Sequence, residues 1–202
     1  MAHILLILLG CNVFDILLNR IEVAGQFLQN SINTQNTKNI KIDWFLSGGI
    51  KFAHPNAESE AIIMQRLIKT KLAKIYNQDQ FQSQYQSQYQ SQYPYKDHEQ
   101  NIYQGLNNWN FILDTKSTNT AQNFVRASLY YNETFSKYSD VYIITSAFHK
   151  ERANKLMNYI DPTNKFKWIL GSAELDDSRK MEQIHIKNVY SDYIGAIQSI
   201  ND

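Results

Sequence analysis

Six consecutive apolar residues run into a glycine and the only cysteine of the chain, Ile4-Leu5-Leu6-Ile7-Leu8-Leu9-Gly10-Cys11. Such a run is typical of a parallel strand that is buried on both faces. A very short signal peptide ending at a lipidated cysteine is the alternative. The run lacks a basic segment before it, however, and is at the lower limit of length for a signal peptide. We therefore predict a buried strand at residues 4–9.

Helical and strand patterns alternate along the rest of the chain. Apolar residues at helical spacing predict helices at residues 15–28, 56–74, 120–131, 149–159 and 181–200. Short apolar runs predict further strands at residues 42–46, 109–113, 141–145 and 166–170. This alternation implies right-handed crossovers. We predict an α/β fold with a mainly parallel sheet of about five strands, covered by helices on both faces.

Residues 77–108 are rich in Gln, Ser, Tyr and Asn and contain three consecutive Gln-Ser-Gln-Tyr copies. Few aliphatic residues accompany the tyrosines, and Pro94 would end a helix. We predict a mobile surface insertion here, within a single domain that spans residues 1–202. An amphipathic helix through the regularly spaced tyrosines is the alternative. The polar residues 30–39 are predicted to form a loop.

The composition narrows the class of protein. With 202 residues, 43% hydrophobic and 19% charged, the chain has the size and balance of one globular domain. A net charge of +1 gives no bulk attraction to nucleic acid or to an anionic membrane. A single cysteine excludes an intrachain disulfide and a thiolate-rich metal site. We expect a soluble cytoplasmic protein without a transmembrane helix, and its oligomeric state stays open.

Ligands of parallel sheets bind at the carboxyl ends of the strands, near the point where the strand order reverses. Gly10, Cys11 and Asn12 follow the first predicted strand, and Ser47-Gly48-Gly49 follow the second. Glycines allow backbone N–H groups to approach an anion closely, although two glycines are as typical of a plain turn.

The loop after the third strand carries Ser117-Thr118-Asn119-Thr120, directly before a predicted helix. One of these side chains should cap free N–H groups of the helix, which leaves the others available to a ligand. Asn123 lies one turn further on the same side. Capping alone explains the motif about as well as ligand binding does.

Ser146, His149 and Arg152 follow the fourth strand. The three-residue spacing places the imidazole and the guanidinium on one face, beside the positive end of the helix dipole. A guanidinium suits phosphate or carboxylate, and an imidazole can transfer a proton near neutral pH. The alternative is a surface arginine paired with Glu151 or Glu133 and a capping histidine.

Acidic side chains open the second predicted helix at Glu58 and Glu60. Carboxylates stabilise a helix start without any further role, but one of them can also face the site. His54, Glu58 and Asp114 do not show a recognised metal-ligand spacing, so no metal is predicted.

A series of short motifs runs along the chain: Leu9-Gly10, Arg20, Ser47-Gly48-Gly49, Ser59-Glu60-Ala61, Lys116-Ser117-Thr118-Asn119-Thr120 with Asn123, and Thr145-Ser146-Ala147-Phe148-His149-Lys150-Glu151-Arg152-Ala153. Their order resembles that of the YdcF/SanA/ElyC family, also called domain of unknown function 218. The resemblance implies a Rossmann-like three-layer sandwich whose motifs converge on one site. It marks as site residues Arg20, Gly48, Gly49, Glu60, Ser117, Asn119, Thr120, Asn123, His149 and Arg152.

The resemblance also implies possible ligands and contexts. Bacterial relatives are often membrane-anchored and are linked to envelope or peptidoglycan precursor metabolism, and a member has been associated with S-adenosylmethionine. Asp114 stands where the family commonly carries Glu.

Our leading hypothesis is a hydrolase or transferase that acts on a phosphate-bearing small anion. Arg152 and Arg20 would hold the anion, and the residue 47–49 amides and the 117–120 loop would cradle it. His149 would be general acid or base, and Glu60 would orient it or a water nucleophile. Gly10, Asn12 and Ser146 would contribute further ligand contacts. Cys11 is interpreted as a small buried filler rather than a nucleophile.

Two other hypotheses stay open. The first is a domain that binds S-adenosylmethionine or a nucleotide without hydrolase activity. The second is an interaction protein that acts through the Gln-Ser-Gln-Tyr insertion.

Overall fold

The computed structural model describes residues 2–11, 13–35, 40–50, 58–85, 109–134, 137–163 and 165–201. The strands are β1 (His3–Leu9), β2 (Lys41–Ser47), β3 (Trp109–Asp114), β4 (Asp140–Ser146) and β5 (Lys167–Gly171). The helices are α1 (Phe14–Gln35), α2 (Glu60–Tyr85), α4 (Thr120–Thr134), α5 (Lys150–Ile160), α6 (Ser178–Lys187) and α7 (Val189–Asn201), and a 3₁₀ turn, η2 (Ala147–His149), precedes α5.

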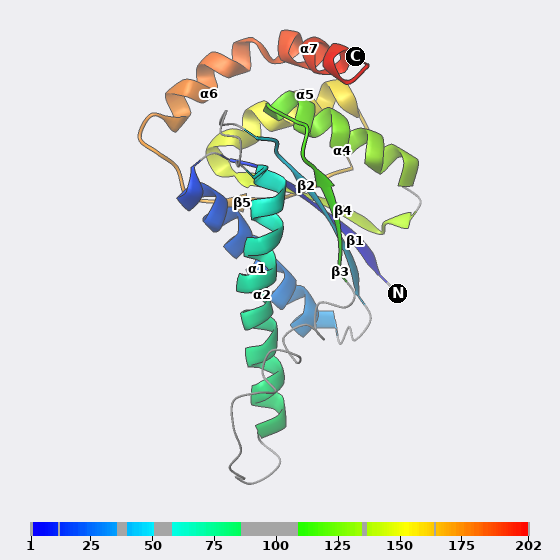
Figure 1. Ribbon diagram of the computed structural model, residues 1–202, viewed down its shortest axis with the longest axis vertical. Coiled ribbons are helices and arrows are strands. Elements are labelled where there is room, and N and C mark those ends of the chain that lie inside the picture. Colours follow the sequence, from blue (N-terminus) through cyan, green and yellow to red (C-terminus); the bar gives the residue numbers. More distant parts are fainter. Residues whose placement is uncertain are drawn as a thin grey trace.

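The described strands form one parallel sheet in the order β3-β2-β1-β4-β5 (Figure 1). From β1 the chain builds outward to β2 and β3, and it then returns to place β4 on the other side of β1. The strand order therefore reverses between β1 and β4. This architecture confirms the predicted α/β fold, and the carboxyl ends of β1 and β4 mark the expected ligand position.

Alternate residues of β1 face two separate hydrophobic cores. Leu6 and Leu8 pack with side chains of α1 and α2, whereas Leu5 and Ile7 pack with side chains of α4, α5 and α7. Figure 1 shows these two groups of helices on opposite sides of the sheet. Burial on both sides explains why β1 needs an unbroken apolar run.

Two helices extend further than the sequence predicts. α1 continues to Gln35 through part of the predicted loop, and α2 continues to Tyr85 through residues 77–85 of the predicted insertion. Neither extension contains Gly or Pro, and a helix that has already formed lengthens at little cost. Residues 77–85 thus belong to α2, which projects beyond the sheet in Figure 1. Residues 36–39 and 86–108 lie outside the described part.

Other boundaries also differ from the prediction. The segment predicted as one helix at 181–200 forms α6 and α7, separated at Asn188 with φ −104° and ψ 6°. Asn favours such non-helical positions because its side chain competes for backbone hydrogen bonds. α2 begins at Glu60 rather than near residue 56, and His149 belongs to η2. No described helix has an apolar stretch long enough to cross a bilayer.

A buried carboxylate lies at the amino-terminal edge of the sheet, away from the expected ligand position. Asp43 of β2 is 0% exposed and accepts hydrogen bonds from Lys137 Nζ at 2.9 Å and Tyr138 Oη at 2.7 Å. His3 Nε2 lies 3.1 Å from Asp43 Oδ1. Burial acts to raise the pKa of Asp43, but the hydrogen bonds from Lys137, Tyr138 and His3 outweigh it and lower that pKa.

We predict that Asp43→Asn lowers the free energy of unfolding at pH 7 by about 1.5–3 kcal/mol, because it removes hydrogen bonds to a charged group. The folded-state pKa of Asp43 lies below its ordinary value of 3.8. Its contribution is therefore present above pH about 4 and is lost as the pH falls through the folded pKa. Urea denaturation at pH 7 and at pH 3 should show a smaller difference between variant and wild type at pH 3.

The matched control is Asp140→Asn, which removes the carboxylate of a largely exposed pair with Lys167 in the same sheet. It should change the stability by less than about 1 kcal/mol. Equal effects of the two substitutions would contradict a special role for Asp43.

Candidate functional site

Arg20 joins the carboxyl ends of β1 and β4. Its Nη1 donates to the carbonyl oxygens of Leu9 at 3.0 Å and Gly10 at 3.3 Å, and its Nε donates to Ser146 Oγ at 3.0 Å. The residue is on α1 and is only 3% exposed. Three residues that the sequence marks as candidates, Gly10, Arg20 and Ser146, thus meet where the strand order reverses.

Several charges act on the Arg20 guanidinium. Burial is the main cause that lowers the pKa of Arg20, and the positive charge of Arg152 acts in the same direction. Electrostatic interactions with Cys11, Glu60 and Glu182 act in the opposite direction. Among the described residues, however, no carboxylate forms a direct ion pair with Arg20. The hydrogen bonds of this buried cation go to neutral acceptors.

The Glu60 carboxylate lies against two glycines. A Cβ atom at Gly48 would lie 2.6 Å from Glu60 Oε2, and one at Gly10 would collide with the same oxygen. Glu60 opens α2, and its N–H donates to the carbonyl oxygen of Gly49 at 3.2 Å. The absence of side chains at Gly10 and Gly48 therefore makes room for a buried carboxylate of the protein itself.

The backbone N–H groups of the three candidate glycines donate hydrogen bonds to other groups of the protein. Gly10 donates to the carbonyl of Ser47 at 2.8 Å, Gly48 to that of Asp114 at 3.0 Å, and Gly49 to that of Ser117 at 2.6 Å. These bonds connect the carboxyl ends of β1, β2 and β3. The amides expected to cradle an anion are engaged in holding these loops together.

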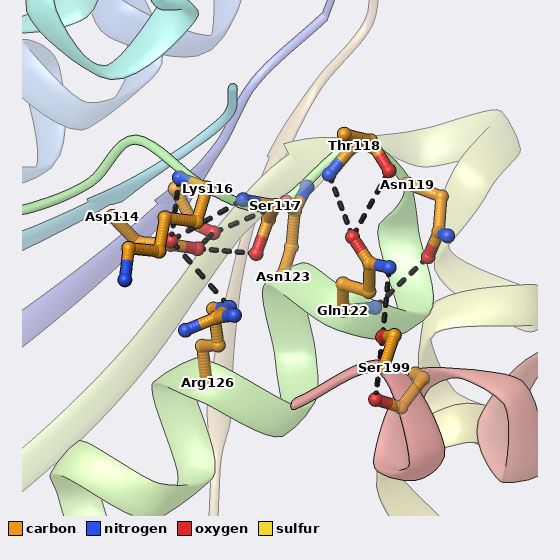
Figure 2. A network of polar contacts seen from close by, with 11 residues as sticks. Asp114, Lys116, Ser117, Thr118, Asn119, Gln122, Asn123, Arg126 and Ser199 are labelled. Carbon is orange, nitrogen blue, oxygen red and sulfur yellow. Dashed lines mark hydrogen bonds and ion pairs between the residues drawn. The ribbon is translucent and has the colours of Figure 1, made fainter. Parts of the chain in front are cut away.

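Asp114 is the centre of a second polar cluster, at the ends of β2 and β3 (Figure 2). It accepts hydrogen bonds from Ser47 Oγ at 2.5 Å, from Ser117 Oγ and from the N–H of Lys116 at 3.1 Å. Ser47 Oγ also lies 3.1 Å from Asn123 Oδ1. The candidates Ser47, Ser117 and Asn123 are thus brought together around a carboxylate whose role the sequence left open.

Asn119 caps α4. Its Oδ1 accepts a hydrogen bond from the N–H of Gln122 at 2.9 Å, while Gln122 Nε2 donates to Ser199 Oγ of α7 at 2.9 Å (Figure 2). Thr120 is the first residue of α4. The structure therefore gives Asn119 the capping role that the sequence offered as an alternative to ligand binding.

His149 and Arg152 form a chain of hydrogen bonds with Thr145 and Glu182. His149 Nδ1 lies 2.8 Å from Thr145 Oγ1, and Arg152 Nη2 donates to His149 Nε2 at 2.9 Å. A guanidinium can only donate, so Nε2 accepts and the ring proton is on Nδ1. The imidazole is therefore neutral in this arrangement, and its Nε2 lone pair holds Arg152.

Glu182 of α6 is the acidic partner of Arg152. Arg152 Nε donates to Glu182 Oε2 at 2.7 Å, and Nη2 donates to Oε1 at 2.9 Å. Glu151, one of the two partners named in the alternative interpretation, instead forms an exposed pair with Lys155. Glu182 was missed because nothing in the local pattern connects it to a residue of another helix.

The remaining predictions about the site concern Asn12, Cys11 and metal binding. Asn12 lies outside the described residues. Cys11 is partly buried, and its side chain packs against the core on the α1 and α2 side. No group of three or more His, Cys, Asp or Glu side chains within the described part is arranged to hold a metal ion.

We predict that Gly49→Ala lowers the free energy of unfolding by about 1–3 kcal/mol, as overpacked sites do. A Cβ atom there would lie 2.6 Å from the carbonyl oxygen of Ser117, which is backbone and cannot move alone. The control is Gly195→Ala in α7, where a Cβ atom meets nothing within 4 Å. It should stabilise the protein by about 0.5–1 kcal/mol in thermal denaturation. An unchanged free energy of unfolding for Gly49→Ala would refute the close approach of Gly49 to the Ser117 carbonyl oxygen.

No family model matches the sequence, and no curated protein matches it significantly. The resemblance to the YdcF/SanA/ElyC family therefore stays a prediction.

Proposed function

We propose that the carboxyl-terminal edge of the sheet binds a phosphate-bearing small molecule through Arg20 and Arg152, and that the protein hydrolyses it or transfers one of its groups. The observation that carries this proposal is the charge balance at Arg20. It is a buried guanidinium whose hydrogen bonds go to neutral acceptors. Glu60 and Glu182 act favourably on it and Arg152 unfavourably, but no carboxylate of the described residues pairs with it directly.

An anion bound between the two guanidiniums would give Arg20 the direct ionic partner that it lacks among the described residues. Buried charges are costly unless an opposite charge lies close to them, and phosphate matches the planar fork of an arginine. The position beside the reversal of strand order is also the usual ligand position of parallel α/β sheets. Because the glycine amides are used internally, side chains rather than backbone N–H groups would recognise the anion.

His149 is the acid–base group in this proposal. In hydrolysis, a water oxygen bonds to phosphorus, one water proton passes to His149 Nε2, and the bond from phosphorus to the leaving oxygen breaks. The leaving oxygen keeps the bonding electron pair and takes a proton from solvent. Nε2 accepts from Arg152 in the structure, so this role requires the ligand to draw the guanidinium away first.

The motif order that resembles the YdcF/SanA/ElyC family supports a common site, and membership of that family is part of the proposal. A second candidate function is binding of S-adenosylmethionine or a nucleotide. It is favoured by the Glu60 carboxylate beside the turn after β1, since acidic groups near this turn bind ribose hydroxyls in many nucleotide-binding domains. A cytoplasmic location belongs to the same proposal.

We predict that inorganic phosphate and pyrophosphate raise the melting temperature of the wild-type protein and that Arg152→Gln weakens their binding about tenfold or more. Calorimetric titration measures the affinity. Arg179→Gln is the control, because Arg179 is an exposed arginine paired with Glu174, and it should leave the affinity unchanged. Stabilisation by S-adenosylmethionine alone would favour the second candidate.

The His149→Gln variant separates two roles of the imidazole, which are to hold Arg152 and to transfer a proton. Glutamine still offers an acceptor to Arg152 but cannot transfer a proton at neutral pH. We expect kcat for hydrolysis of para-nitrophenyl phosphate to fall about 10²–10⁴-fold with little change in KM. A raised KM with unchanged kcat would mean that His149 only positions Arg152.

A further inference from the structure

α6 is attached to the rest of the protein by a charged residue. Glu182 is its buried residue at 6% exposure, whereas Met181 and Ile184 of the same helix are 51% and 55% exposed. Residues 172–188 are all described, and none of them belongs to either hydrophobic core. The helix thus contributes no side chain to the apolar interior.

The buried contact of α6 is the two-bond pair between Glu182 and Arg152. The Arg152 side chain is 13% exposed, so both partners are largely removed from water. His149 Nε2 also lies 3.9 Å from Glu182 Oε1. Two more described ion pairs of this segment, Arg179 with Glu174 and Lys180 with Asp177, involve exposed side chains. Pairs of that kind contribute little to stability, so the Glu182–Arg152 pair dominates the polar attachment of α6.

The carboxylate of Glu182 binds Arg152 as an external anion would. A guanidinium donates two parallel N–H···O bonds to Glu182, and both carboxylate and phosphate accept from arginine in this arrangement. We propose that Glu182 occupies the anion-binding fork of Arg152, and that a phosphate group of the ligand displaces it and thereby releases α6 from α5. This inference rests on the proposed function.

Displacement exchanges one anion for another at the same guanidinium, so the fork keeps an opposite charge throughout. It exposes little apolar surface, because Met181 and Ile184 already face water and no residue of α6 belongs to either hydrophobic core. Glu182 therefore acts as an internal competitor that lowers the apparent affinity for the ligand. α6 lies at the end of the molecule where the strands terminate, and it contacts η2 and α5 (Figure 1).

The test compares Glu182→Gln with Glu174→Gln. Both substitutions remove one negative charge from the same segment, but only Glu182 contacts Arg152. We expect Glu182→Gln to bind inorganic phosphate and pyrophosphate about tenfold more tightly than wild type in calorimetric titrations at constant ionic strength. Glu174→Gln should stay close to the wild-type affinity.

Hydrogen exchange gives a second readout that does not depend on a variant. The amides of residues 178–187 should exchange faster in the wild-type protein saturated with phosphate than in chloride at the same ionic strength. Unchanged or slower exchange there would overturn the release of α6, and so would equal phosphate affinities of the two variants.

The outcomes also separate this inference from the proposed function. If the wild-type protein binds phosphate and Arg152→Gln abolishes binding, but Glu182→Gln binds no tighter, the proposed function stands and the competitor role is wrong. If neither the wild-type protein nor Glu182→Gln binds any of the anions, both proposals are wrong. Should Glu182→Gln fail to fold, the exchange measurement on the wild-type protein decides.

Discussion

The buried guanidinium of Arg20 is the contact on which the candidate site depends. It links β1 and β4 at the reversal of strand order, through two carbonyl oxygens and Ser146 Oγ. A buried cation is costly unless negative charge lies near it, and here Glu60 and Glu182 supply that charge without a direct ion pair. The fold thus fixes a positive charge at the end of the central strand, and the surrounding acidic groups are arranged around it.

The loops at the carboxyl ends of the strands are joined to one another by hydrogen bonds. The amides after β1 and β2 donate to neighbouring loops, and Asp114 gathers the hydroxyl groups of Ser47 and Ser117. In the proposed function, recognition of a ligand is therefore left to long side chains on α1 and α5. Such side chains can exchange partners without breaking the backbone connections that hold the strand ends in place, whereas a backbone cradle could not.

The strands and the order of the main elements could be predicted from the sequence, because burial on both faces requires apolar runs such as that of β1. Helix ends were predicted less well, since polar residues such as those after Asn30 continue a helix as readily as they form a loop. At the site, the glycines suggested backbone amides that are free to bind an anion. The carbonyl groups that accept hydrogen bonds from these amides belong to segments far away in the sequence, so the local pattern could not reveal them. The partners of Arg152 and Asp43 depend in the same way on tertiary contacts. Asp43 was not singled out from the sequence, although a lone carboxylate within an apolar strand is a local pattern that could have marked it as needing partners.

The central position of β1 also has a consequence for biosynthesis. β1 leaves the ribosome well before its neighbour β4, which follows more than a hundred residues later, and Arg20 is 126 residues from Ser146. Until β4 emerges, one edge of the most apolar strand has no pairing partner. The nascent chain therefore exposes an aggregation-prone edge throughout the interval between β1 and β4, which makes this strand a natural binding segment for chaperones.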